Sequence, residues 1–285
     1  MDLRASIRSF LQSRAVWRFK QNKGAIIGLI IIIIIVFCAL FAEYIMPYDP
    51  IEINKDEKLL HPSLEHLFGT DDLGRDIFSR VIYGCRVSLR VASLSVVLAL
   101  IVGIPLGLVA GYYGRVVDNI IMRVMDIIFA FPDILLALTV VSIMGRGMTN
   151  VSIALGIVYT PIFVRLIRGL VLSIREMPYI EAAKAIGEKE WRIMFQEILP
   201  NCAAPLIVQA TLTISYAILA EAALSFLGLG TQPPIPSWGR MLSEGRVFMR
   251  SMPWIAVFPG LACMISVLAF NLFGDGLEDA LNPRR

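Results

Sequence analysis

The segment that decides the fold is residues 181–200, EAAKAIGEKEWRIMFQEILP, a charged, helix-patterned stretch between two apolar segments. A short helix can begin just before it at Pro178, because the first helical position needs no backbone N–H donor. Gly187 is the expected left-handed stop of that helix. The apolar side chains of this helix fall on one face: Tyr179, Ala182, Ala183 and Ile186. A stretch this charged cannot span a bilayer, so it must lie at the membrane surface or dock against a soluble partner.

A second short helix follows Gly187 in the pattern. Its apolar residues recur at i, i+3, i+4, i+7 and i+8, which predicts one apolar stripe. The stripe is formed by Trp191, Met194, Phe195, Ile198 and Leu199. Pro200 predicts the end of this helix, since proline cannot continue the hydrogen-bond ladder.

The spacing of these residues resembles the EAA loop found in permease subunits of ATP-binding-cassette importers. The resemblance implies that six positions couple the chain to an ATPase: Glu181, Ala182, Ala183, Gly187, Leu199 and Pro200. One position departs from the general pattern, because Glu197 stands where an isoleucine is usual. Its neighbour Ile198 begins the sequence I-L-P-N, which resembles the motif of the peptide-transport branch. The alternative interpretation is a generic amphipathic cytoplasmic loop.

The composition is that of a membrane protein. The 285 residues are 57% hydrophobic and 17% charged, with a mean hydropathy of +0.72. A soluble domain has about 45–50% apolar and about 25% charged residues. The four cysteines have no metal or disulfide spacing and are expected to be small apolar packing residues. The chain is therefore predicted to be an all-α polytopic membrane protein.

Six apolar segments predict six transmembrane helices, since about 20 residues cross a bilayer. They are 24–46, 87–111, 117–143, 150–173, 203–228 and 254–276. The first apolar run is too long for a cleaved signal, and the basic amphipathic segment 1–23 before it predicts a cytoplasmic N-terminus. An even number of spans then places the tail, 277–285, and the loop 174–202 inside. Loops 47–86 and 229–253 are expected outside, around a five-helix transport core at 87–276.

A second motif lies in the first of these outer loops. Residues 66–80 read HLFGTDDLGRDIFSR, and they resemble the F-G-T-D-x-x-G-R-D signature of the C-type permease in the peptide/nickel branch of importers. Two further stretches, 221–242 and 258–284, resemble the same branch. The resemblance implies the permease fold of a type I importer. Taken without it, the three aspartates with His66 are also compatible with a metal site, although acidic turn residues are common in exposed loops.

Motifs for chemistry within the chain are absent. The sequence has no G-x-x-x-x-G-K-[ST] loop, so it is not expected to bind ATP, and no H-E-x-x-H or G-x-S-x-G. We therefore predict a transport subunit that is not an enzyme and binds no cofactor or metal, with ATP and Mg²⁺ used by separate ATPase subunits.

Ionisable residues inside spans are costly and often line pathways. Asp133 and Glu221 are the candidates for the pathway or a gate, and a structural pairing with a neighbouring helix is an equal alternative. Arg123 and Asp126 are three residues apart and are expected to pair with each other. Arg165 and Arg168 are expected to extend toward the headgroups.

The resemblance implies a complex in a bacterial or archaeal plasma membrane. Its members would be a second, related permease of B type, two cytoplasmic ATPase subunits and an extracytoplasmic peptide-binding protein, with no nucleic acid. The expected solutes are di- or oligopeptides. Nickel chelates and glutathione-like solutes are the alternative within transport, and a non-transporting channel or assembly protein is the alternative of another class.

Overall fold

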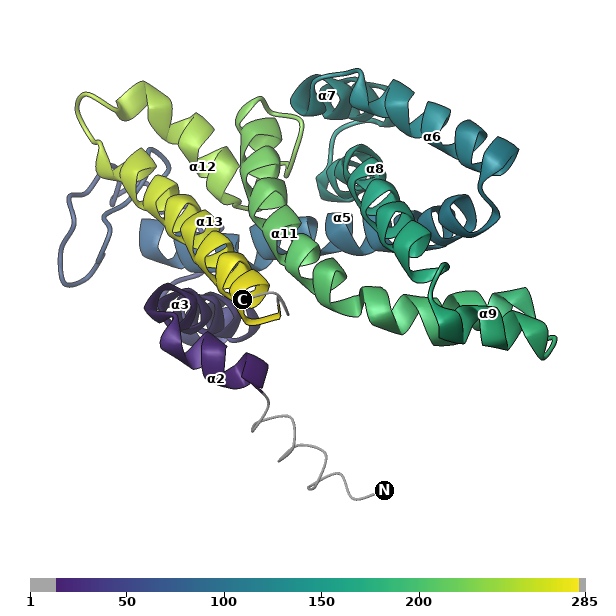
Figure 1. Ribbon diagram of the computed structural model, residues 1–285. Coiled ribbons are helices and arrows are strands. Elements are labelled where there is room, and N and C mark those ends of the chain that lie inside the picture. Colours follow the sequence, from purple (N-terminus) through teal and green to yellow (C-terminus); the bar gives the residue numbers. More distant parts are fainter. Residues whose placement is uncertain (1–13, 282–285) are drawn as a thin grey trace.

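The computed structural model describes residues 14–281, which are helical apart from turns, loops and one isolated bridge between Thr70 and Asp76 (Figure 1). The α-helices are α2 (Arg14–Gln21), α3 (Lys23–Leu40), α4 (Ala42–Ile45), α5 (Ile77–Tyr113), α6 (Arg115–Phe129), α7 (Asp133–Met144), α8 (Met148–Ile174), α9 (Pro178–Ala185), α10 (Glu190–Arg192), α11 (Ala203–Phe226), α12 (Trp238–Gly245) and α13 (Trp254–Leu281). A π-helix at Ile193–Ile198 and a 3₁₀-helix at Leu199–Cys202 join α10 to α11. The expected basic segment is described only from Arg14 onward, and residues 1–13 and 282–285 lie outside the described part of the chain.

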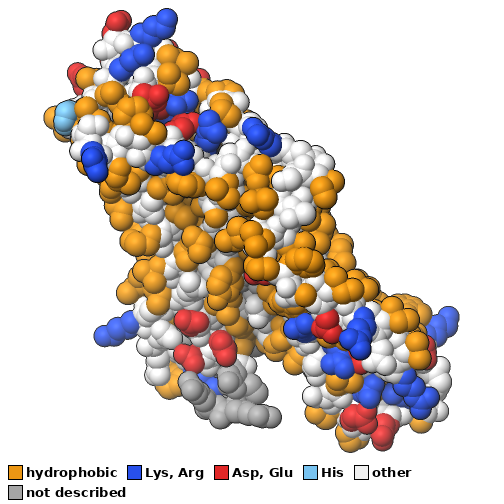
Figure 2. Space-filling model, turned by 90° about the horizontal axis from the view of Figure 1, so that it is seen from above, with side chains coloured by type: hydrophobic (Ala, Val, Ile, Leu, Met, Phe, Trp, Pro, Cys, Tyr) orange, Lys and Arg blue, Asp and Glu red, His pale blue; other side chains and the backbone are white. Residues whose placement is uncertain are grey.

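The described helices confirm an all-α membrane protein. Five are long and apolar enough to cross a membrane: α3, α5, α8, the continuous stretch Glu190–Phe226 and α13. A sixth crossing is available if the pair α6 and α7 counts as one span. Figure 2 shows hydrophobic side chains in a band across the middle of one face, with Lys, Arg, Asp and Glu gathered toward its ends. This separation is the one that a bilayer imposes on a spanning protein.

The third span differs from the sequence prediction. Residues 117–143 are not one continuous helix, because α6 and α7 meet at a 92° bend. The cause lies at Pro132, which has no N–H for the ladder and disfavours helical backbone at the residue before it. The prediction of one continuous helix over 117–143 is therefore wrong.

The bent pair nevertheless connects the two ends of the helix bundle. At one end, here the α9 end, Tyr113 at the close of α5 hydrogen-bonds Glu190, and Asn22 before α3 lies 3.4 Å from Asp279 near the close of α13. At the opposite end, the α12 end, the backbone N–H of Gly147 donates to Leu229 after α11. Helix α6 starts at the α9 end and α7 finishes at the α12 end. The pair therefore serves as one broken crossing.

Two predicted boundaries need correction. Helix α5 begins at Ile77, ten residues before the expected 87, because the Asp76 side chain caps it by accepting from the Ser79 N–H at 2.7 Å. Pro200 does not end the second loop helix, since helical backbone continues through it into α11. The π- and 3₁₀-turns around it change the hydrogen-bond register, which accommodates a residue that cannot donate.

The most extensive helix contact of the fold is between α5 and α8. Three glycines at four-residue intervals on α5 face α8: Gly103, Gly107 and Gly111. A Cβ on each would lie only 2.7–2.8 Å from the Cβ of Phe163, Ile167 or Val171, respectively. Small residues let helix backbones approach in membranes, where packing replaces the hydrophobic effect as the driving force. This glycine stripe therefore fixes the distance between the two helices.

This packing makes a direct prediction. Replacing Gly107 with alanine should lower the stability of the protein by about 1–3 kcal/mol, because the methyl group must displace Ile167 and the Val164 carbonyl. The matched control is Gly169→Ala on α8, whose Cβ would meet nothing within 4 Å. That variant should be unchanged or slightly more stable. Thermal unfolding of the two purified variants in detergent measures the difference, and equal midpoints would contradict the role of the stripe.

Candidate functional site

The segment 177–202 projects from the bundle at the α9 end (Figure 1). Helix α9 begins at Pro178, as predicted, and finishes just before Gly187. Gly187 has φ of +78°, which confirms the left-handed stop, since an L side chain is strained there. A Cβ at this position would meet nothing within 4 Å, so the described chain requires glycine for its backbone conformation and not for packing.

Helix α9 presents most of its predicted apolar face to the outside. Tyr179, Ala182 and Ile186 are exposed, and the exposed fraction of Ile186 is 82%. Ala183, expected on the same face, is instead buried with Ile180 against the rest of the protein. The apolar face expected to meet a partner is thus present without Ala183. Glu181 is exposed beside it.

The predicted apolar stripe of the second loop helix is only partly buried. Met194 and Ile198 are buried, whereas Trp191 and Phe195 are about half exposed. The π-helix explains why only some of these side chains are buried. Its wider turn shifts side chains out of the 3.6-residue register on which the stripe was predicted. Leu199 is half-buried against the main apolar core, and Pro200 is exposed.

The outward apolar side chains of the two helices are together called the coupling surface here. It comprises Met177, Tyr179, Ile186, Trp191 and Phe195, each at least 43% exposed. Charged residues alternate with these apolar residues along the sequence. Their side chains are exposed as well, among them Glu181, Lys184 and Lys189. An exposed apolar face with a charged rim is the form in which a helix docks into the groove of a protein partner.

Polar contacts hold the coupling surface to the end of α5. The Tyr113 hydroxyl lies 2.7 Å from Glu190, and Arg175 donates to the Gly111 carbonyl at 2.9 Å. The Lys184 ammonium lies 5.4 Å from the centre of the Tyr112 ring, within range of a cation–π contact. A displacement of the loop therefore acts directly on α5.

At the α12 end, the motif at 66–80 forms a set of ion pairs that ties the outer loop to α12. Arg75 donates through Nε to Asp71 at 2.7 Å and through Nη2 to Glu244 at 3.2 Å. Arg80, which is buried, donates to the same Glu244 oxygen at 3.0 Å. We call these four residues the outer clamp. Their role in the structure is to hold residues 71–80 against α12.

His66 belongs to the same loop but forms no metal site in the structure. Its Nδ1 lies 2.9 Å from Asp76 and its Nε2 lies 3.3 Å from Glu57. Asp76 is already engaged as the cap of α5. Between residues 14 and 281, no cluster of three or more His, Cys, Asp and Glu side chains could hold a metal ion.

The two pathway candidates lie in different surroundings. Asp133 is exposed at the 92° bend, as the first residue of α7. Glu221 is buried in α11, where it accepts hydrogen bonds from Ser88 of α5 at 2.9 Å and from Ser225 at 2.7 Å. The contacts of Glu221 are those of the structural alternative, and its role in a pathway stays a hypothesis, as does that of Asp133.

The remaining charged residues of the spans pair differently from the sequence prediction. Asp126 of α6 accepts from Arg165 of α8 at 2.8 Å, and not from Arg123. Asp118 accepts from Arg168 at 2.7 Å. Both α8 arginines thus pair with α6, and their extension toward the headgroups stays a prediction. Pairing between helices was missed because a sequence shows neighbours on one helix and not those across two.

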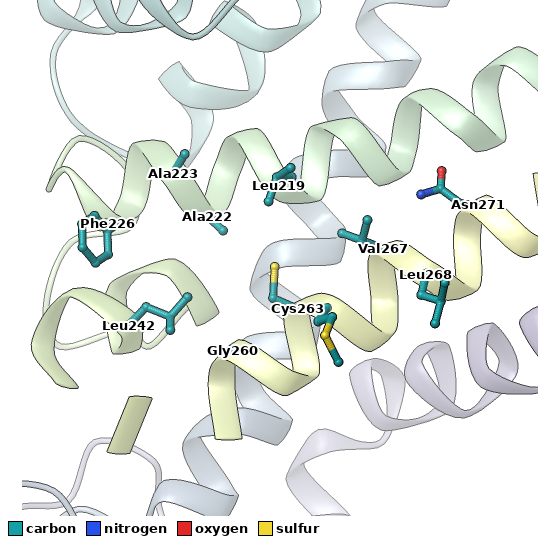
Figure 3. Close-up of a pocket in the computed structure, with 11 residues that line it drawn as sticks. Leu219, Ala222, Ala223, Phe226, Leu242, Gly260, Cys263, Val267, Leu268 and Asn271 are labelled. Carbon is teal, nitrogen blue, oxygen red and sulfur yellow. The ribbon is translucent and has the colours of Figure 1, made fainter. Parts of the chain in front are cut away.

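An apolar groove of about 590 Å³ runs between α11, α12 and α13 within the hydrophobic band (Figure 3). Leu219 and Phe226 line it from α11, Leu242 from α12, and Cys263 and Asn271 from α13. The side-chain amide oxygen of Asn271 accepts a hydrogen bond from the Ser215 hydroxyl at 2.7 Å, so this oxygen has a partner within the chain. The groove was not predicted, because it depends on how three helices separated in sequence diverge.

Comparison with protein families gives two matches that together cover most of the chain. Residues 103–285 match the binding-protein-dependent transport system inner membrane component family. Residues 9–62 match the N-terminal transmembrane domain of oligopeptide transport permease C.

Several characterised proteins are similar over nearly the whole length. The dipeptide transport system permease protein DppC of Alkalihalophilus pseudofirmus is 54% identical over 94% of this chain and 88% of its own. The di/tripeptide permease DppC of Pseudomonas aeruginosa is 49% identical over 98% and 92%, respectively. The glutathione transport system permease GsiD of Pectobacterium atrosepticum is 46% identical over 95% and 91%.

Among solved structures, an inward-facing form of the MetNI methionine ABC transporter is similar to this chain. The match has a TM-score of 0.57 at 18% identity and covers 71% of this chain and 97% of that one. At this identity the likeness shows the fold alone, which is a fold found in an ABC transporter.

Proposed function

The chain belongs to the binding-protein-dependent transport system inner membrane component family, and we propose that it is the permease subunit through which an importer moves dipeptides. It is a multi-pass inner membrane permease of an ABC transporter, a transport subunit and not an enzyme. As such a component it works with an ATPase and a binding protein. No cofactor of its own is expected for a permease subunit.

The substrate assignment rests on one observation, which is the 48–54% identity to several dipeptide permeases over more than nine-tenths of the chain. The glutathione permease at 46% identity supports a second candidate. Glutathione is itself a small peptide, so the two candidates share backbone amides and carboxylates. We propose dipeptides as the first substrate and glutathione as the alternative.

We propose a heteromeric complex for the assembled transporter, with a second, related permease, two cytoplasmic ATPase subunits and a peptide-binding protein outside. The apolar groove between α11 and α13 supports a permease partner, because it leaves a hydrophobic surface open within the spanning region. The coupling surface supports the ATPase partner. Closure of the ATPase pair would move that surface, and α5 would carry the movement into the spans through its contacts at Gly111 and Tyr113.

We propose that the α9 end is cytoplasmic and the α12 end is outside, so that both termini lie inside. The basic residues before α3 support this orientation. A membrane-impermeant thiol reagent applied to intact cells should label Ser63→Cys, in the outer loop, and leave Glu188→Cys unlabelled until the cells are opened. Labelling of Glu188→Cys in intact cells would overturn the orientation.

Coupling can be tested at Gly187. A Gly187→Leu variant should lose most of its ATP-driven uptake, because a left-handed backbone costs a branched side chain about 1–2 kcal/mol and tilts the coupling surface. Gly187→Asn is the matched control, since asparagine tolerates this conformation, and it should retain most of the uptake. Uptake and ATPase stimulation are measured in vesicles that contain equal amounts of assembled complex. Normal coupling in the leucine variant would refute the role of Gly187.

The function itself is tested by transport of a defined solute. Vesicles with the complete complex should take up a labelled dipeptide only with ATP and the binding protein, and omission of this chain should abolish the uptake. Glutathione and a nickel chelate are tested in parallel. Uptake of either of these without dipeptide uptake would replace the proposed substrate, and solute flux without ATP would favour a channel.

A further inference from the structure

Arg90 is a charged residue inside a spanning helix without a partner in the described chain. It lies on α5, is exposed, and makes no hydrogen bond or ion pair with any residue between 14 and 281. Arg86, one turn nearer the α12 end, has its guanidinium occupied by Glu43 at 2.7 Å and by the Ala39 carbonyl at 3.1 Å. A charge on a spanning helix is costly unless it faces water or an opposite charge. Arg90 was not among the candidate residues predicted from the sequence.

Arg90 lines a pocket of about 360 Å³ at the α12 end. Helix α5 contributes Tyr83, Arg86 and Arg90. The start of α8 contributes Met148 and the preceding Gly147, and the loop after α11 contributes Thr231, Gln232 and Ile235. Three separate elements thus converge on one cavity. The hydrogen bond from Gly147 to Leu229 holds two of these elements together.

The pocket has polar groups that the described chain leaves unused. The Thr231 hydroxyl is buried and has no hydrogen-bond partner among the described residues. Gln232 donates its amide N–H groups to the carbonyls of Gly228 and Gly230, at 3.1 and 2.9 Å, and its own amide oxygen remains open as an acceptor in the described chain. A buried polar group without a partner is rare in native proteins, and it indicates a ligand or water that satisfies it.

The charge of the pocket selects the chemistry of a ligand. Glu43 balances Arg86, so the net positive charge comes from Arg90. A guanidinium without a carboxylate pairs best with a carboxylate in two parallel hydrogen bonds. A dipeptide supplies one carboxylate together with N–H groups for an open amide oxygen. Its extended length of roughly 7 Å, at about 3.3–3.6 Å per residue, fits a small cavity of this kind.

We propose that this pocket binds the C-terminal carboxylate of a short peptide, with Arg90 as the residue that holds the charge. The proposal rests on the proposed function for the identity of the solute. Its position at the α12 end places it where a solute delivered from outside would first meet this chain. Arg90 would then select for a free carboxylate before the solute enters the pathway.

The experiment measures how a ligand protects a cysteine placed in the pocket. Ile235 lines the pocket, is partly exposed and has no polar role, so Ile235→Cys reports access without removing a proposed contact. In vesicles with the assembled complex, the rate of thiol labelling is followed with increasing alanyl-alanine or with its C-terminal amide. The parent chain gives the background, since three of its four cysteines are buried and Cys38 is partly so.

We expect alanyl-alanine to slow labelling and the amide to need at least tenfold higher concentration. Adding Arg90→Gln should remove this difference, Arg90→Lys should restore part of it, and Arg250→Gln, which removes an exposed charge near the same end, should leave it intact. Equal protection by acid and amide, or protection that survives Arg90→Gln, would overturn the proposal. Absence of protection in the unaltered pocket would overturn it as well, and would point to a lipid phosphate as the partner of Arg90.

Uptake in the same vesicles separates this proposal from the proposed function. If no dipeptide is imported but alanyl-alanine protects in an Arg90-dependent way, the transport assignment fails and the carboxylate site stands. If dipeptide import is normal and unaffected by Arg90→Gln, with no protection, the site fails and the transport assignment stands.

Discussion

The close approach of α5 and α8 is the constraint on which the rest of the structure depends. Three glycines at positions 103, 107 and 111 bring the α5 backbone against the Cβ atoms of α8. In lipid, helices gain nothing by hiding apolar surface from one another, so stability must come from dense packing. Larger side chains at these positions would push α5 and α8 apart along two full turns. The other helices then take their places around a pair whose geometry is already set.

Helix α5 also joins the two functional ends of the molecule. Its first turns carry Arg80 of the outer clamp, and its last residues hold the coupling surface through Gly111 and Tyr113. It is one continuous α-helix from Ile77 to Tyr113. A rigid helix transmits displacement without needing a chain of side-chain rearrangements between its ends. The motif at 66–80 and the loop at 177–202, which look unrelated in sequence, are therefore attached to the same mechanical element.

The class of fold, most of the spans and most of the apolar face of α9 were predictable from periodicity and composition, because these features depend on local sequence pattern. The prolines show where that information stops. Pro105 and Pro161 remain inside helices, whereas Pro132 produces a 92° bend and Pro200 is absorbed by a change of helical register. All four lack the same hydrogen bond, so the outcome is decided by neighbouring elements. The pairing of Asp126 with Arg165, the groove beside α11 and the pocket at Arg90 were missed for the same reason.

The two ways in which helices are joined to α8 have different energetic consequences. Helix α5 is joined by backbone-close packing, which any separation would replace with a void. Helix α6 is joined by ion pairs from Asp118 and Asp126, and the pair of Asp126 with Arg165 is about half exposed on both sides. Exposed ion pairs contribute roughly 0–1 kcal/mol each. Separation of Asp126 from Arg165 is therefore expected to cost less than separation of α5 from α8, and the bend at Pro132 already interrupts the backbone ladder at the end of the same helix.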